Sequence, residues 1–288
     1  MTSSSTAAPC PLCGASSRPF GAEGQGPYRG CPACGALFLH PMPTPQQMRA
    51  YAEHHYREGV YAEYARARPL KLATFRRRLA LIRRHAPAGR LLDLGSACGF
   101  MLEAALEAGY DPSGVEFSLP AIELAAPGIR PRLTHGDVND LPPGRYDVLT
   151  AFDIIEHQLD PGATLRRWAD RLRPGGVLVL TTPDAGSPLR HLLGRRWPML
   201  QPLQHTVLFT RSAMGRLLGQ AGFDLLEVRG AHKVMTPAYL AGQLEPYFPR
   251  LSRAALRLGR AAPGLAGLAI PFRIGEFLAL ARKRPARE

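Results

Sequence analysis

Two pairs of cysteines near the start of the chain have the spacing of metal ligands. Cys10 and Cys13 form one pair, Cys31 and Cys34 form the other, and 17 residues separate the pairs. Four thiolates in two close pairs at this distance are typical of a tetrahedral zinc site. Because the four thiolates complete the coordination, the predicted Zn2+ is structural and not catalytic.

The alternative for these cysteines is two disulfides. Residues 1–8 are rich in Ser, Thr and Ala and carry neither a basic start nor an apolar run, so we expect no signal peptide. Disulfides are rare in a reducing compartment. The sequence therefore favours zinc, and it predicts a cytoplasmic protein.

A second group of residues has the pattern of a nucleoside site. Gly95 and Gly99 lie in a predicted strand-to-helix loop, but Ala97 interrupts the G-x-G-x-x-G spacing that suits a pyrophosphate. Glu116 ends the next strand, where it could accept hydrogen bonds from two ribose hydroxyls. Asp137 follows the third strand and could accept one from an adenine amino group. The predicted ligand is a nucleoside without phosphates.

The elements that position these residues alternate between strand and helix. Apolar runs predict strands at 90–95, 113–116, 132–135, 146–152, 177–182, 224–229 and 276–282. Helical patterns cover 46–85, 99–108, 119–126, 162–172 and 210–221. This alternation predicts an α/β fold with helices on both faces of a mostly parallel sheet. Ligands of such sheets bind at the carboxyl ends of the strands, where the glycine loop falls.

These motifs, in this order, resemble those of the class I S-adenosylmethionine-dependent methyltransferases. The resemblance spans roughly residues 90–229 and depends on the segments 93–99, 114–116, 136–137, 152–157 and 172–176. It implies a Rossmann-like sheet of seven strands, mostly parallel with the last strand antiparallel. The cysteine spacing adds a small zinc ribbon before this sheet. It also implies that the cofactor is S-adenosyl-L-methionine.

The resemblance implies a set of cofactor-binding residues. They are Asp93, Gly95, Ala97, Gly99, Glu116, Phe117, Asp137, Val138, Phe152 and Asp153. Ala97 stands where the family usually has glycine. An alanine is tolerated there if its backbone dihedral angles stay outside the regions that only glycine adopts.

Two histidines are candidates for the catalytic base. Methyl transfer to a hydroxyl needs a group that removes a proton, and histidine is suited to this near neutral pH. His157 follows the fourth strand of the predicted sheet and is the first candidate; His205 is the second. The alternative for each histidine is a structural role, in which the ring fixes a loop by hydrogen bonds.

The acceptor is predicted less directly. The cysteine pairs and the segments 155–157 and 205–210 are similar to a bacterial subgroup that includes ubiquinone-type O-methyltransferases and sugar methyltransferases. This implies a small-molecule acceptor, methylated on a hydroxyl of a sugar, glycan or secondary-metabolite intermediate. The net charge of +13 favours an anionic, phosphate- or nucleotide-linked acceptor. Arg190, Arg195, Arg196 and Trp197 could clamp such a phosphate, unless they form a solvated loop.

The predicted domains are a zinc module (1–40), a helical link (41–88), the cofactor domain (89–230) and a C-terminal helical lid with a final strand (231–288). Arginines and apolar residues alternate over 239–272. We expect this tail to cover the acceptor pocket, with contact to a membrane surface as the alternative. The chain has no apolar run long enough for a transmembrane helix.

A methyltransferase of rRNA or tRNA is the rival function, because a zinc module and a basic chain would suit it. The basic residues are scattered, however, and the fourth strand is not followed by an Asn-Pro-Pro-aromatic or Pro-Cys motif. Nucleic acid is therefore a disfavoured partner. A scaffold without activity is disfavoured by the intact Glu116 and Asp137. The sequence predicts no oligomeric state.

Overall fold

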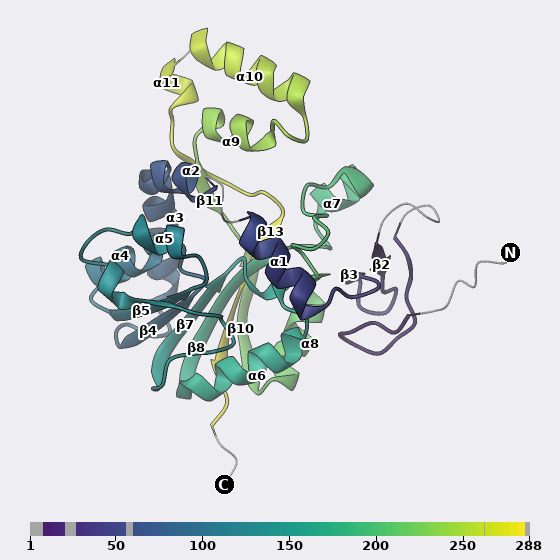
Figure 1. The fold of residues 1–288 in the computed structure, drawn as a ribbon, viewed down its shortest axis with the longest axis vertical. Coiled ribbons are helices and arrows are strands. Elements are labelled where there is room, and N and C mark those ends of the chain that lie inside the picture. Colours follow the sequence, from purple (N-terminus) through teal and green to yellow (C-terminus); the bar gives the residue numbers. More distant parts are fainter. Residues whose placement is uncertain (1–7, 21–26, 56–59, 262, 286–288) are drawn as a thin grey trace, which may run out of the picture.

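The protein is described by a computed structural model for residues 8–20, 27–55, 60–261 and 263–285. A sheet of seven strands forms its centre, in the order β10-β13-β8-β7-β4-β5-β6 (Figure 1). The strands are β4 (Arg90–Leu94), β5 (Asp111–Glu116), β6 (Leu133–His135), β7 (Tyr146–Phe152), β8 (Leu172–Pro183), β10 (Phe223–Gly230) and β13 (Glu276–Lys283). Only β13 runs antiparallel to its neighbours in this sheet. The predicted seven-stranded fold is confirmed.

Helices cover both faces of the sheet, as the sequence predicts. One face is covered by α3 (Arg68–Ile82) and α4 (Phe100–Glu107), whose apolar side chains pack against β4, β7 and β8. The other face is covered by α6 (Pro161–Arg171) and α8 (Arg211–Gln220), with Trp168 at the centre of that core. Two shorter elements, α5 (Leu119–Glu123) and η1 (Arg130–Arg132), lie between β5 and β6.

Side-chain caps start three of these helices. The side chains of Ser118, Asp160 and Thr210 accept hydrogen bonds from backbone amides in the first turns of α5, α6 and α8. Such caps satisfy amides that have no partner inside the helix.

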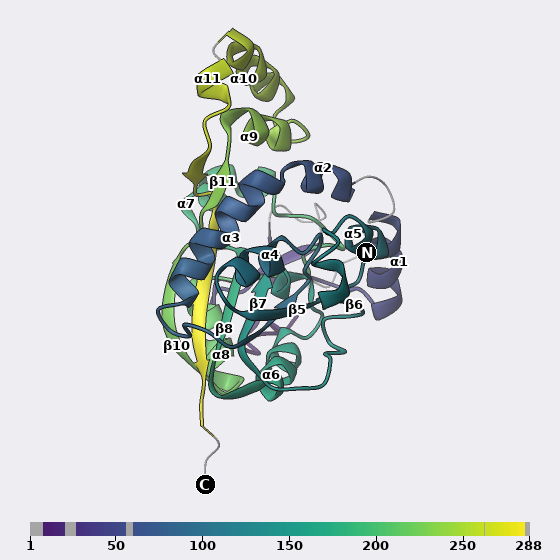
Figure 2. The ribbon, with the colours of Figure 1, turned by 90° about the vertical axis from the view of Figure 1, so that its left-hand side faces the viewer.

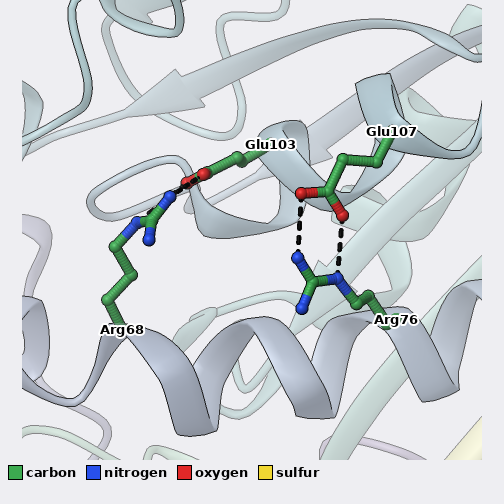
Figure 3. A network of polar contacts seen from close by, with 4 residues as sticks. All are labelled: Arg68, Arg76, Glu103 and Glu107. Atoms are coloured by element: carbon green, nitrogen blue, oxygen red, sulfur yellow. Dashed lines mark hydrogen bonds and ion pairs between the residues drawn. The ribbon is translucent and has the colours of Figure 1, made fainter.

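The helical link is α1 (Pro45–His55) and α2 (Val60–Arg66), which lead into α3. Two ion pairs on the surface fasten α3 to α4: Arg68 with Glu103, and Arg76 with Glu107, whose Nε–Oε2 distance is 2.8 Å (Figure 3). Exposed pairs contribute little free energy. Their role here is to fix the register of α3 along α4.

The cysteine module is a small antiparallel sheet of β1 (Arg18–Pro19), β2 (Tyr28–Gly30) and β3 (Leu37–Leu39). A fourth strand, β9 (Val207–Leu208), pairs with β3, although it lies about 170 residues later in the chain. No pattern in the sequence predicts this strand, because two residues are too few to show a period.

An arm (residues 233–272) leaves the sheet after β10 and returns to it at β13. It begins and ends in an antiparallel ribbon, β11 (Lys233–Met235) and β12 (Ile270–Phe272). Between them α9 (Pro237–Leu244), α10 (Pro249–Ala261) and α11 (Pro263–Ala266) project away from the sheet (Figures 1 and 2). Within the described ranges, no helix has the length and apolar character needed to cross a membrane.

The segment from β8 to β9 holds α7 (Pro188–Leu193) and η3 (Gly194–Arg196), and η2 (Ile155–His157) follows β7. Trp197 is buried, 2% exposed, in an apolar cluster with Tyr28, Leu37 and Leu208. The expectation that Trp197 and its neighbouring arginines form a solvated loop is therefore wrong for Trp197, which joins this segment to the cysteine module.

Candidate active site

The loop after β4 has the tight backbone that a nucleoside needs for close approach. Gly95 has a φ of +70° and Gly99 a φ of +73°. An added Cβ on Gly95 would collide with Ile154, and one on Gly99 would lie 2.5 Å from Ile129. Ala97 also lies in the left-handed region, with a φ of +48°. Residues with a side chain adopt that region at a cost of about 1–2 kcal/mol, so Ala97 is strained where glycine would not be.

Glu116 ties this loop to the end of β5. Its Oε2 accepts a hydrogen bond from the Ala97 amide at 2.7 Å, and its Oε1 accepts one from the Ser118 amide at 2.8 Å. Burial raises the pKa of Glu116, and these amide hydrogen bonds offset part of that rise. The carboxylate is 5% exposed and lies where the sequence predicts a ribose.

Asp93 lies behind the loop, at the end of β4. Its Oδ1 accepts a hydrogen bond from Thr150 Oγ1 at 2.6 Å, and its backbone carbonyl accepts one from Ser96 Oγ at 2.8 Å. Burial raises the pKa of Asp93 to about 7, and the hydrogen bond from Thr150 limits that rise. Asp93 therefore supports the loop from inside the protein and does not face solvent.

The adenine side of the predicted site is open. Asp137 is exposed at the end of β6, and its Oδ1 accepts hydrogen bonds from the backbone and side-chain amides of Asn139. Val138 is half-buried and its carbonyl accepts from Trp168. Phe117 is half-buried after β5, its ring 6.4 Å from that of His135. These positions are compatible with an adenine ring between β5 and β6.

A half-buried charge network lies beyond the end of β7. Asp153, with a φ of +60°, accepts a hydrogen bond from Thr181 and forms an ion pair with Lys233 at 2.9 Å. Lys233 also pairs with Glu276 at 2.6 Å. Burial alone would raise the pKa of Asp153, but Lys233 and Arg78 outweigh it and hold that pKa well below its usual range.

Two cations from α3 join this network, and the sequence analysis missed both. The Arg78 guanidinium lies 4.3 Å from the centre of the Phe152 ring, and its Nε and Nη2 have no hydrogen-bond partner among the described residues. Lys71 lies 4.4 Å from the centre of the Tyr64 ring, and burial together with Lys233 lowers its pKa to about 8. Arg78 lies on the buried face of α3 together with Phe75 and Ile82. A cation at that helical spacing among apolar residues was the sequence signal that could have identified it.

His157 and His205 meet at the same edge of the sheet. Their ring centroids are 5.1 Å apart. The Nδ1 atom of His157 lies 2.7 Å from the Gln204 carbonyl, and that of His205 lies 2.7 Å from the Met199 carbonyl. A carbonyl accepts, so both Nδ1 atoms donate, which makes Nε2 the basic nitrogen of each neutral ring.

The two histidines differ in their electrostatics. Burial lowers the pKa of His205 to about 4, and the neighbouring His157 adds to that decrease. His205 therefore stays neutral at physiological pH. His205 is 6% exposed, whereas His157 is half-buried, so His157 is the more accessible of the two rings.

Glu156 is fully buried next to the histidine pair. Neither of its carboxylate oxygens, nor the hydroxyl of neighbouring Thr182, has a partner of good geometry among the described residues. Burial raises the pKa of Glu156 well above its usual value, and the charge of Asp153 adds to this. Glu156, His157 and His205 each offer a ligand atom within 4.8 Å of the others, so the set could share a proton or hold a divalent cation.

The four cysteines of the module converge as a structural zinc site requires. None of them forms a disulfide. The Sγ atoms of Cys10 and Cys34 are 3.7 Å apart, and those of Cys13 and Cys31 are 3.5 Å apart. Zn–S bonds of about 2.3 Å in a tetrahedron place the sulfurs about 3.8 Å apart. The donor set and its geometry therefore fit Zn2+.

Comparison with known proteins agrees with this geometry. Residues 64–228 match the protein family described as "Methyltransferase domain". A ubiquinone biosynthesis O-methyltransferase of Nitrosospira multiformis is 30% identical over 183 residues, which cover 58% of this chain and 77% of that protein. A protein of the same name from Bordetella avium is 29% identical over 101 residues, which cover 32% of this chain and 42% of that protein.

A solved structure shares the fold. It is the 1,6-didemethyltoxoflavin-N1-methyltransferase of Burkholderia thailandensis, with bound 1,6-didemethyltoxoflavin and S-adenosylhomocysteine. The TM-score is 0.54 at 17% identity, and the match covers 93% of this chain and 99% of that one. At this identity the likeness shows the fold and not the acceptor.

Proposed function

Since this chain belongs to the methyltransferase domain family, as a class I S-adenosylmethionine-dependent methyltransferase, we propose that it methylates a hydroxyl oxygen of a small molecule. The histidine pair carries this proposal. Two imidazoles, each fixed by a backbone carbonyl, lie at the edge of the sheet that holds the cofactor loop. The names of the two O-methyltransferase relatives support oxygen as the acceptor atom.

The proposed cofactor site follows the order of the strands. Glu116 accepts hydrogen bonds from the ribose hydroxyls, and Asp137 accepts one from the adenine amino group. The donors that Arg78 leaves without a partner, together with the Lys71 ammonium, suit the carboxylate of the methionine part. The cofactor supplies an activated methyl group on a sulfonium, and the protein orients it toward the acceptor.

His157 is the proposed base. Its Nδ1–H is held by the Gln204 carbonyl, so the proton of the acceptor hydroxyl goes to Nε2 as the oxygen attacks the methyl carbon. His205 stays neutral and packs against His157, which makes it a positioning residue rather than the base. Zn2+ at the four cysteines has a structural role in this proposal.

The proposed acceptor is a sugar, glycan or secondary-metabolite intermediate that carries a negative charge. The net charge of +13 supports an anionic acceptor, because a basic surface raises the local concentration of anions. RNA is the rival acceptor. A long RNA would need a basic groove, whereas the candidate base lies next to the buried carboxyl group of Glu156.

Transfer from labelled cofactor separates these acceptors. The purified protein is incubated with methyl-labelled S-adenosylmethionine and a fractionated bacterial extract. We expect label in small, anionic, protease- and nuclease-resistant compounds. Label in RNA would replace the proposal with the rival function. A folded protein that binds the cofactor but labels no fraction, including purified sugar nucleotides and quinol precursors, would contradict a small-molecule acceptor.

A further inference from the structure

We propose that the cysteine module positions the acceptor site, because Tyr28 and β3 hold the segment that carries His205. This inference rests on the proposed function, in which the histidine pair faces the acceptor. The module would then be more than a separate folding unit that zinc stabilises. It would position the segment that carries His205, and with it the contacts that hold His157, the candidate base.

The first link is a direct hydrogen bond. The Tyr28 hydroxyl donates to the backbone carbonyl of His205 at 2.8 Å. Tyr28 is 5% exposed and His205 is 6% exposed, so water does not compete for this bond. Loss of the hydroxyl would leave this buried carbonyl without its partner, which destabilises the segment that carries His205.

The second link is the pairing of β9 with the module. Leu37 and Phe38 of β3 lie opposite Leu208 and Val207 of β9. The Leu39 amide extends the pairing by donating to the Thr206 carbonyl at 2.9 Å. Residues 197–206 contain no helix or strand of their own. The module is therefore the regular structure on which this segment is built.

The third link fastens β9 to a cysteine pair. Thr210 Oγ1 donates to the Cys34 carbonyl at 2.7 Å while accepting from the Ala213 amide at the start of α8. An added Cβ on Gly35 would lie 2.8 Å from Thr210 Cγ2, so the two chains touch at this point. A displacement of Cys34 would therefore reach the segment of β9 through a single residue, Thr210.

The same segment continues to the candidate base. The Thr206 amide donates to the Glu156 carbonyl at 2.8 Å, and Thr206 Oγ1 donates to the Gln158 carbonyl at 2.8 Å. The Gln204 carbonyl accepts from His157 Nδ1 at 2.7 Å. Both histidines are thus positioned by residues 199–206, which the module supports from outside. The cofactor loop after β4 is not part of this chain of contacts.

Tyr28→Phe tests the proposal, since it removes one hydroxyl and keeps the ring in its apolar cluster. Tyr110→Phe is the matched control: Tyr110 is also buried, and its hydroxyl donates to the Ala86 carbonyl, far along the chain from the histidine pair. Three quantities are measured in both variants: affinity for S-adenosylhomocysteine, kcat and KM for an acceptor, and hydrogen exchange of the backbone amides of residues 199–210.

We expect Tyr28→Phe to keep cofactor affinity within about twofold, to lower kcat about tenfold through misplacement of the histidines, and to speed exchange at residues 199–210. Removal of zinc with a chelator should speed exchange in the same segment. A metal indicator reports the release of the zinc. Tyr110→Phe should change neither exchange there nor kcat. Unchanged exchange at 199–210 in both Tyr28→Phe and the zinc-free protein would overturn the inference.

The exchange measurement separates this inference from the proposed function. If the wild-type protein methylates no small molecule, the proposed function fails, and faster exchange at residues 199–210 still supports the structural coupling. If activity is present and Tyr28→Phe loses cofactor affinity as much as kcat, the hydroxyl supports the whole fold, and the assignment of Tyr28 as a positioning residue is wrong.

Discussion

In the proposed cofactor site, Glu116 binds both the backbone of the glycine loop and the ribose with the same carboxylate. Two of its lone pairs accept from the amides of Ala97 and Ser118, and a carboxylate has further acceptor sites for two hydroxyls. We expect Glu116→Ala to weaken S-adenosylmethionine binding by about 1–3 kcal/mol, as measured by calorimetry. Glu123→Ala, on the exposed side of α5, is the control. An unchanged affinity in a folded Glu116→Ala protein would refute the ribose assignment.

The histidine pair allows a sharper test of catalysis. If His157 removes the acceptor proton, His157→Ala should lower kcat by roughly a hundredfold or more and leave cofactor affinity nearly intact. His205→Ala should act less strongly on kcat, because burial keeps the pKa of His205 near 4 and its ring serves to orient His157. Steady-state kinetics with one acceptor compares them. Near-normal turnover in both variants would show that no histidine base is needed.

For single residues, the sequence indicated candidate site residues that lie within motifs. It did not identify those that only the fold brings to the site. The sequence placed Glu116 and Asp93 beside the glycine loop, where the structure has them, because both lie at the ends of strands. Lys71 and Arg78 lie on a helix before the motif, and Lys233 lies on a ribbon after it. Their approach to Asp153 depends on how α3 and β11 pack on the sheet, which no local pattern records.

Among the elements, β4 carries a buried carboxyl group, that of Asp93, which should make the free energy of unfolding depend on pH. The folded-state pKa of Asp93, about 7, lies above the unfolded value of 3.8, so folding favours its protonated form. Stability is then lost as pH rises from about 4 to 7, where the unfolded carboxyl ionises first. Asp93→Asn should reduce the fall in unfolding free energy between pH 5 and pH 8 by about 2–3 kcal/mol. Urea unfolding at both pH values measures this.

Exposed Asp140→Asn is the control for Asp93→Asn, because it changes the same charge without a buried environment. It should leave the pH dependence of unfolding as in the wild type. Equal slopes for the wild type and Asp93→Asn would mean that Asp93 is ionised in the folded protein.

The folding of the cysteine module should depend on its metal. Three short strands and a small apolar cluster bury too little surface to hold this element alone, so zinc binding and folding should be coupled. Elemental analysis should find one zinc per chain. Cys13→Ser should lose that zinc and become sensitive to protease within residues 8–40, whereas Cys98→Ser should keep it. Metal-free protein with paired thiols would contradict the zinc site.

For the whole molecule, apolar patterning predicted a mostly parallel sheet and its helices, whereas the antiparallel last strand was implied by the resemblance to the methyltransferases. It did not predict that β9 joins the module or that β11 and β12 form a ribbon. Such strands of two or three residues are defined by partners far along the chain. The lid over the acceptor pocket stays a prediction, since the arm contacts the rest of the protein near its base, through Gln243 with Glu63 and Tyr247 with Gln201.

The arm combines basic and exposed apolar residues. Residues 249–272 contain four arginines and no acid, and Leu251, Leu258 and Leu265 are each about 70% exposed. Leu251 and Leu258 lie with these arginines on α10, and exposed leucines beside arginines on one helix are typical of contact with an anionic membrane surface. We therefore expect the protein to sediment with vesicles that contain phosphatidylglycerol at low salt, and to be released as salt screens the arginines.

The double variant Leu251→Ser, Leu258→Ser separates the two roles of the arm. If the arm lies on membranes, the variant should lose most vesicle binding and keep kcat and KM for a water-soluble acceptor, because α10 projects away from the sheet (Figure 2). Leu119→Ser, an exposed leucine on α5, is the control and should keep vesicle binding. If the wild type stays in the supernatant and the variant raises KM instead, the arm acts as a lid, and its arginines serve the acceptor rather than a lipid surface.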